Sequence, residues 1–168
     1  MKTSESVAPA LIVIVLGLWL LAEGSSSLPL RPEEHWPLLI IAAGAAFLLG
    51  YVLGAGPWQL FLGVLALGSG LVLLPFSLGL TPWRLLEGVW PCFLIAFGAA
   101  ILAYLAATPV PPLFLLVPGL AGIFTGLTGL LYALGAVPYD PLQQMRSLWP
   151  LVLVATGLLG LAQALALR

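Results

Sequence analysis

The chain has 168 residues, of which 62% are hydrophobic and only 7% are charged, and its net charge is −1. Soluble domains carry about 25% charged residues, so the composition excludes an ordinary soluble protein. No charged residue occurs between His35 and Arg84 or between Glu87 and Asp140. A charge at the centre of a membrane helix costs about 2.5–3.5 kcal/mol, which explains these gaps. A near-neutral chain also lacks the basic face that nucleic acid requires.

The first apolar segment, residues 8–22, lies between Lys2 and Glu23. This pattern fits a membrane span, and it also fits a cleavable signal peptide. The repeat described below favours a span, because cleavage would remove the partner of the next helix. A span needs about 20 apolar residues, so each long uncharged run predicts two more spans and a turn. The expected spans are residues 8–22, 37–55, 57–78, 91–107, 112–134 and 150–167.

A Trp-Pro dipeptide occurs three times, at intervals of 54 and 59 residues, and a glycine follows each proline seven residues later. Tryptophan settles at the level of the lipid headgroups, and proline suits the first turn of a helix. The pair therefore predicts where a helix enters the bilayer. The residues of this repeat motif are Trp36, Pro37 and Gly44, then Trp90, Pro91 and Gly98, then Trp149, Pro150 and Gly157.

Polar stretches precede the Trp-Pro pairs, and we expect a short helix lying in the membrane interface before each pair. The whole pattern predicts an all-α membrane protein whose six transmembrane helices form three repeated hairpins within a single transmembrane domain, residues 1–168. Six spans place both termini on one side, which we expect to be the cytoplasm. Pro118 predicts a kink or a late helix start in the fifth span. The three hairpins are residues 8–55, 57–107 and 112–167.

Small residues at helical spacing predict where the helices pack. Lipid tails are as apolar as leucine, so helices in a bilayer associate through close backbone packing and interhelical hydrogen bonds. Such packing is expected inside the monomer, or alternatively against a homo-oligomer partner or another membrane subunit. The stripe on the second span is Ala42, Ala46, Gly50 and Gly54, and the fifth span carries Gly122 and Gly126.

Residues that could carry chemistry are scarce. No acidic or basic residue lies inside a predicted span, which argues against an ion-coupled transporter or a proton relay. His35 beside Glu33 and Glu34 is the one candidate cluster, but adjacent helical residues do not face one another. The lone cysteine, Cys92, excludes an internal disulfide, and we expect hydroxyl side chains in the spans to bond back to their own helices. We predict no catalytic, cofactor or metal site.

At its Trp-Pro repeats the chain resembles the LiaI-LiaF-like transmembrane region of bacterial envelope-stress proteins. The resemblance implies two-helix hairpins without catalytic residues, in a bacterial inner membrane. Regulatory members carry a soluble C-terminal domain, which we do not expect after the last span here. A second resemblance, of architecture, is to the six-helix HdeD-like acid-resistance membrane proteins. The matching residues are Trp36-Pro37 and Gly44, Val89-Trp90-Pro91, Leu94, Ile95 and Gly98, and Leu148-Trp149-Pro150, Leu153 and Gly157.

From these features we expect a non-enzymatic protein of the bacterial cytoplasmic membrane that acts through lateral contacts with membrane proteins or with copies of itself. It would be a regulator of envelope stress or an accessory subunit of a membrane complex. The alternative is a passive pore, or a transporter of small solutes or lipid, although polar lining is scarce. A third hypothesis is an enzyme that uses the loop face, where Glu33, His35, Arg84 and Asp140 could meet.

Overall fold

The computed structural model describes residues 7–24, 32–138 and 141–166, with backbone alone at 23–24, 32–34, 141–142 and 144–146. Every regular element in these ranges is helical, which confirms the predicted all-α class. The elements are α1 (Val7–Gly24), α2 (Pro32–Val52), α3 (Pro57–Ser77), η2 (Trp83–Leu85), α4 (Leu86–Val89), α5 (Pro91–Ala107), η3 (Leu113–Leu115), α6 (Leu116–Ala133) and α7 (Pro141–Ala166).

Several helices are suited in length and hydropathy to a membrane. Within the described residues, four segments are long and apolar enough to cross a bilayer, and a fifth is obtained if Trp83–Val89 and Pro91–Ala107, bent by 50° at their break, form one span. The apolar part of α1 is shorter. The chain is therefore an apolar helical protein with four or five candidate spans. The four segments are His35–Val52, Pro57–Ser77, Leu113–Ala133 and Ser147–Ala166.

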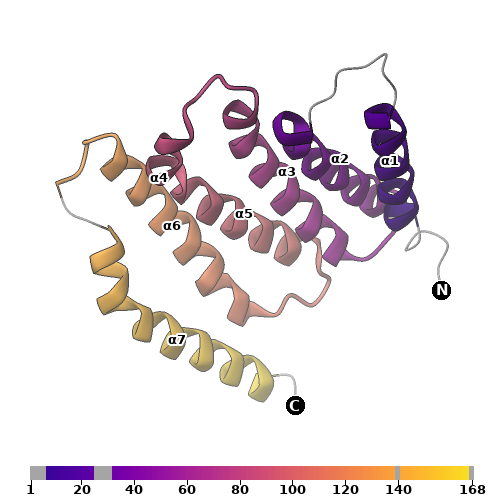
Figure 1. Ribbon diagram of the computed structural model, residues 1–168. Coiled ribbons are helices and arrows are strands. Elements are labelled where there is room, and N and C mark those ends of the chain that lie inside the picture. The colour runs from indigo at the N-terminus through magenta and orange to yellow at the C-terminus, as the bar shows by residue number, and fades with distance from the viewer. Residues whose placement is uncertain (1–6, 25–31, 139–140, 167–168) are drawn as a thin grey trace. The chain divides into compact units, whose positions relative to one another are not determined.

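The chain divides into two compact units, Met1–Leu86 and Glu87–Arg168. In the first unit, α2 packs against α1 and, more extensively, against α3 (Figure 1). In the second unit, α6 packs against α7 and, more extensively, against α5 (Figure 1). The closest pairs are thus α2–α3 and α5–α6, in which a Trp-Pro helix packs on the helix that follows it. The predicted hairpins instead paired each Trp-Pro helix with the helix that precedes it in the chain. The short apolar turns after α2 and α5 explain why each of these helices packs more closely on the helix that follows it.

The predicted short helix before each Trp-Pro pair is found in one copy among the described residues. There, η2 and α4 precede α5. In the first and third copies, α2 and α7 instead run without a break through Pro37 and Pro150, which corrects the prediction. Proline inside a helix loses its own hydrogen bond, but the bonds of the neighbouring residues hold the helix together. In the second copy, Gly88 is a poor helix former two residues before the pair, and the helix breaks after Val89, at Trp90.

Two residues after the ends of α2, α3 and α6 lies a glycine in the left-handed conformation: Gly54, Gly79 and Gly135, with φ of 93°, 70° and 72°. After each glycine, the next backbone N–H donates to a carbonyl oxygen five residues back, at 2.9–3.0 Å. Glycine adopts this conformation readily because it has no Cβ. These caps stop the three helices.

The fifth predicted span starts late, as Pro118 suggested. The 3-10 turn η3 comes first, and α6 begins at Leu116, so that Pro118 is its third residue. A proline in the first turn of a helix loses no hydrogen bond, because the N–H groups there have no partner within the helix. This prediction is confirmed.

Candidate functional site

Helices α2 and α3 approach one another at glycines. A methyl group added at Gly44 would lie 2.7 Å from the backbone nitrogen of Leu67 and 3.1 Å from the carbonyl oxygen of Gly63. One added at Gly70 would lie 3.3 Å from the carbonyl oxygen of Pro37. These separations are shorter than a comfortable carbon contact. The two backbones therefore meet closely because these positions have no side chains.

The same contacts recur between α5 and α6. A methyl group at Gly98 would lie 2.5 Å from the carbonyl oxygen of Gly119 and 2.9 Å from the backbone nitrogen of Ile123. One at Gly126 would lie 2.7 Å from the carbonyl oxygen of Pro91. Residues on α5 lie 54 positions after their counterparts on α2, and those on α6 lie 56 positions after theirs on α3. We call this packing of a Trp-Pro helix on a glycine-bearing helix the glycine interface.

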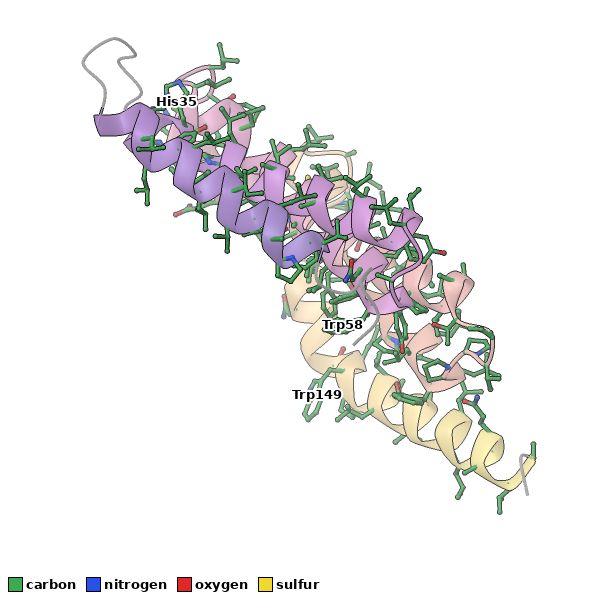
Figure 2. The ribbon with its side chains drawn as sticks, turned by 90° about the vertical axis from the view of Figure 1, so that its right-hand side faces the viewer. His35, Trp58 and Trp149 are labelled. Carbon is green, nitrogen blue, oxygen red and sulfur yellow. The ribbon has the colours of Figure 1, made fainter. Side chains whose placement is uncertain are left out.

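The third Trp-Pro helix, α7, differs from the other two. Among the described residues, nothing lies within 4 Å of a methyl group added at Gly157. Pro150 is exposed, whereas Pro37 and Pro91 are fully buried. Trp149 is 53% exposed, and Figure 2 shows its side chain extending from α7. The face of α7 that corresponds to the glycine interface is therefore open within its unit.

A second type of contact joins a Trp-Pro helix to the helix that precedes it. Between α1 and α2 it contains an apolar pocket of about 180 Å³. Between α5, α6 and α7 it contains a pocket of about 350 Å³, lined mainly by aliphatic and aromatic side chains. Such apolar surfaces suit alkyl chains or the side chains of a packed helix. The larger pocket is lined by Leu94, Phe97, Pro118, Ala121, Gly122, Phe124, Thr125, Thr128, Leu148, Trp149, Val152 and Leu153.

A side-chain amide also holds α7 to its unit. The Nε2 group of Gln163 donates to the carbonyl oxygen of Pro111 at 2.8 Å. Its Oε1 atom accepts from the backbone N–H of Leu113, also at 2.8 Å. Both partners lie in the segment that leads into α6, where Pro112 interrupts the run of backbone donors. Gln163 therefore supplies hydrogen-bond partners to two backbone groups that lie outside the α-helices, the carbonyl oxygen of Pro111 and the N–H of Leu113.

Three hydroxyl side chains bond back to their own helices, as the sequence predicted. Ser77 donates to the carbonyl oxygen of Leu74 at 3.0 Å, and Thr156 donates to that of Val152 at 2.6 Å. Thr128 donates to carbonyl oxygens three and four residues earlier on α6. These bonds satisfy the three hydroxyl donors within their own helices.

The predicted packing stripe on α2 is found in part. Ala46 and Gly50 are buried, and Ala42 is half-buried. A methyl group added at Gly50 would overlap the side-chain oxygen of Gln59 on α3 and lie 3.3 Å from Cβ of Ala8 on α1. Gly54 does not belong to this stripe, because it lies beyond the end of α2 with nothing within 4 Å of an added methyl group. Its role is the left-handed cap described above, which the spacing of small residues could not reveal.

On α6, the predicted residue Gly126 lies in the glycine interface, and a methyl group added at Gly122 would lie 3.2 Å from the carbonyl oxygen of Leu94. The sequence interpretation overlooked Gly63 and Gly119, which carry the same interface in the two units. The sequence did carry a signal for them. Helices α3 and α6 share one pattern, in which a glycine is followed four residues later by leucine or isoleucine and three residues after that by a second glycine.

The His35 cluster does not assemble into a site among the residues that the structure describes. His35 is half-buried near the beginning of α2, close to where α1 ends (Figure 2), and its ring centroid lies 6.5 Å from that of Trp19. Arg84 is exposed. The side chains of Glu33, Glu34 and Asp140 lie outside the described residues. Within the described part, no three His, Cys, Asp or Glu side chains come together as metal ligands would.

Comparisons with known proteins add no relative: no family model, no curated protein and no solved structure matches the chain. The resemblance to the LiaI-LiaF-like region stays a prediction from the Trp-Pro motifs. The interfaces between the helices are therefore the observations from which a function is inferred.

Proposed function

We propose that this chain is a non-enzymatic, multi-pass protein of the bacterial cytoplasmic membrane that acts through lateral contacts with other membrane proteins. In this role it is a regulator of envelope stress or an accessory subunit of a membrane complex. The open face of α7 carries the proposal. Equivalent faces on α2 and α5 are each covered by a helix, while Gly157 has open space beside it. A helix of another protein chain is the natural occupant of such a face within a bilayer.

The proposal includes six spans in three hairpins, with both termini in the cytoplasm. Two helices fall short by length, α5 with 17 residues and α1, whose apolar segment is Val7–Ala22. At 1.5 Å per residue, α5 reaches about 26 Å and the apolar segment of α1 about 24 Å. The hydrocarbon core is about 30 Å thick, and small mismatches are absorbed by local thinning. Their lengths therefore support two further spans.

Extraction of the tagged protein from its native membrane with a mild detergent, followed by mass spectrometry, tests the proposal. We expect a membrane protein to accompany it in near-stoichiometric amount. The Gly157→Ile variant should lose at least tenfold of that protein, because the added side chain fills the open face. Ala162→Ile, an exposed position one to two turns further along α7, should lose none. Recovery of a bare monomer, together with silent envelope-stress reporters after deletion, would contradict the proposal.

One observation favours a second candidate function, the movement of lipid or another apolar solute. The pocket of about 350 Å³ in the second unit has a lining that suits an alkyl chain. Purified protein in liposomes should then move a fluorescent lipid faster than empty liposomes do. Ala121→Trp, which fills the pocket, should abolish this movement, and equal rates with and without protein would exclude the function.

A further inference from the structure

The larger pocket, between α5, α6 and α7, lies away from the contacts that hold α7 to its unit. Gln163 bonds the segment that leads into α6, and a methyl group added at Gly160 would lie 3.5 Å from Cβ of Phe114. Nearer the beginning of α7, the side chains of Trp149 and Leu153 line the pocket instead. This part of α7 therefore borders a space that no side chain of the described residues fills.

The outer end of the pocket can be placed along the helices. Helix α7 runs back along α6 (Figure 1), and Gln163 meets Leu113 at one end of the pair. Trp149 lies fourteen residues before Gln163. At 1.5 Å per residue, Trp149 is therefore about level with the part of α6 that carries Thr125 and Thr128. All three residues line the pocket, which agrees with this placement.

The pocket extends from the edge of the hydrocarbon toward its middle. Trp149 is the third residue of the apolar segment Ser147–Ala166, which places the outer end of the pocket near the membrane surface. Pro118 marks the inner end, ten residues and about 15 Å from Thr128 along α6. The hydrocarbon core is about 30 Å thick, so the acyl chains of one leaflet span about 15 Å. The pocket has the length of one such chain.

The volume of the pocket decides between an acyl chain and a helix as its occupant. An α-helix with its side chains is about 10–12 Å across, so one turn of 5.4 Å takes up about 420–610 Å³. The pocket has about 350 Å³ and does not hold one turn. An acyl chain is a single file of methylene groups, and a lining of aliphatic and aromatic side chains suits it.

One polar group in this lining has no partner in its own helix. The hydroxyl of Thr128 donates to the carbonyl oxygens of Phe124 and Thr125. Thr125 also lines the pocket, but the part of the chain that the structure describes gives its hydroxyl no hydrogen bond. A hydroxyl in apolar surroundings is costly without such a bond. Near the edge of the hydrocarbon, an ester carbonyl oxygen of a phospholipid can accept it.

A positive charge lies just outside this end of the pocket. Arg146 is the one charged residue in the sequences of α5, α6 and α7. It precedes Trp149 by three residues, which places it about 4.5 Å further out along the helix. At 100° per residue it lies about 60° around α7 from Trp149 and about 20° from Leu153. A basic residue at the membrane surface attracts negatively charged lipid groups.

We propose that the pocket of the second unit binds one glycerophospholipid, with an acyl chain in the pocket, an ester carbonyl oxygen at the Thr125 hydroxyl and the phosphate at the level of Arg146. The inference rests on the proposed placement in a membrane, and it gives the lipid of the second candidate function a chemical class. It requires no movement of that lipid. Phospholipid that binds without being moved would exclude the transport candidate and leave this inference standing.

Native mass spectrometry of the whole chain in a mild detergent, titrated with phosphatidylglycerol, tests the inference. We expect one bound phospholipid per chain. Ala121→Trp, which fills the pocket, should weaken binding at least tenfold, whereas Ala162→Trp, at an exposed position outside the lining, should leave binding unchanged. Thr125→Val should weaken binding about threefold, as expected for one hydrogen bond in a membrane protein. Thr128→Val is the matched control, because that hydroxyl already bonds its own helix.

Diacylglycerol is a second probe, because it has the same chains and esters but no phosphate. The unmodified chain should bind phosphatidylglycerol about fivefold more tightly than diacylglycerol, which corresponds to about 1 kcal/mol for one basic residue at a membrane surface. Arg146→Gln should remove this preference.

Four outcomes would overturn the inference. Equal binding by the unmodified chain and Ala121→Trp would show that lipid is held only on the outer surface of the helices. Equal binding by Thr125→Val and Thr128→Val would exclude the ester contact, and this pair decides alone if Ala121→Trp does not fold. A preference for phospholipid that survives in Arg146→Gln would exclude the phosphate position. No bound phospholipid, with a membrane protein still recovered on extraction, would refute the inference and leave the lateral-contact function standing.

Discussion

At the scale of single residues, the absence of a methyl group decides where helices meet. Gly44 and Gly98 lie at equivalent places in two interfaces, and each faces the backbone of its partner helix. Backbone atoms cannot move aside as the end of a flexible side chain can. In a bilayer, where lipid competes with side chains for apolar contact, such close approach is the main source of helix association.

Alanine at Gly98 should therefore destabilise the protein. The new methyl group would lie 2.5 Å from the carbonyl oxygen of Gly119, so α5 and α6 must separate. Overpacking of this kind costs about 1–3 kcal/mol. Thermal unfolding in a mild detergent should show a lower midpoint for Gly98→Ala. Gly56→Ala is the control, because its φ is −68° and it has open space, and an equal loss in both variants would contradict this account.

At the scale of elements, helix ends and connections determine which helices pair closely. The turn after α2 is short and closed by the cap at Gly54, so α3 returns directly along α2. Helix α7 follows a longer connection and packs less extensively on α6. Its attachment depends instead on Gln163, whose amide bonds two backbone groups of the segment leading into α6.

Replacing Gln163 by leucine should loosen α7. The change removes two hydrogen bonds, and interhelical bonds in membrane proteins are worth about 0.6 kcal/mol each on average. We expect a loss of about 1 kcal/mol in unfolding free energy and faster proteolysis near residues 135–141. Ala162→Leu serves as the control, because Ala162 is the exposed residue next to Gln163. If the two variants were equally stable, the amide bonds would have no structural importance.

At the scale of the whole molecule, the charges indicate how the chain lies in a membrane. The exposed groups Arg84 and Glu87 belong to a polar connection, while the long helices between the connections are uncharged over their apolar segments. Charge is expelled from hydrocarbon, so the polar connections are expected at the membrane surface. Six spans would place those connections on one side and both termini on the other.

Labelling of single cysteines with a membrane-impermeant reagent tests this arrangement in a Cys92→Ser background. Cysteine at Ser4 should react only from the cytoplasmic side, and so should cysteine at the turn residue Gly56, whose φ of −68° accepts a side chain. Cysteine at Thr81 should react only from the opposite side. Identical accessibility of Ser4 and Thr81 would exclude the six-span arrangement, because an odd number of spans separates those positions in it.

The sequence alone determined the helical class and the approximate places of the apolar helices, because charged residues are excluded from segments that lie in hydrocarbon and their positions therefore mark the segment ends. It also marked Gly44 and Gly98 through their fixed distance from Trp-Pro. Pairing was decided only in the tertiary structure, since the face on which a helix meets its neighbour depends on turns and on backbone approach. The tertiary structure also showed that Gly54 is a cap, that Pro37 and Pro150 lie within continuous helices, and that Gly63 and Gly119 complete interfaces. Apolar periodicity is weak in a helix that is apolar all round, so its sequence does not distinguish the face that packs from the face that meets lipid.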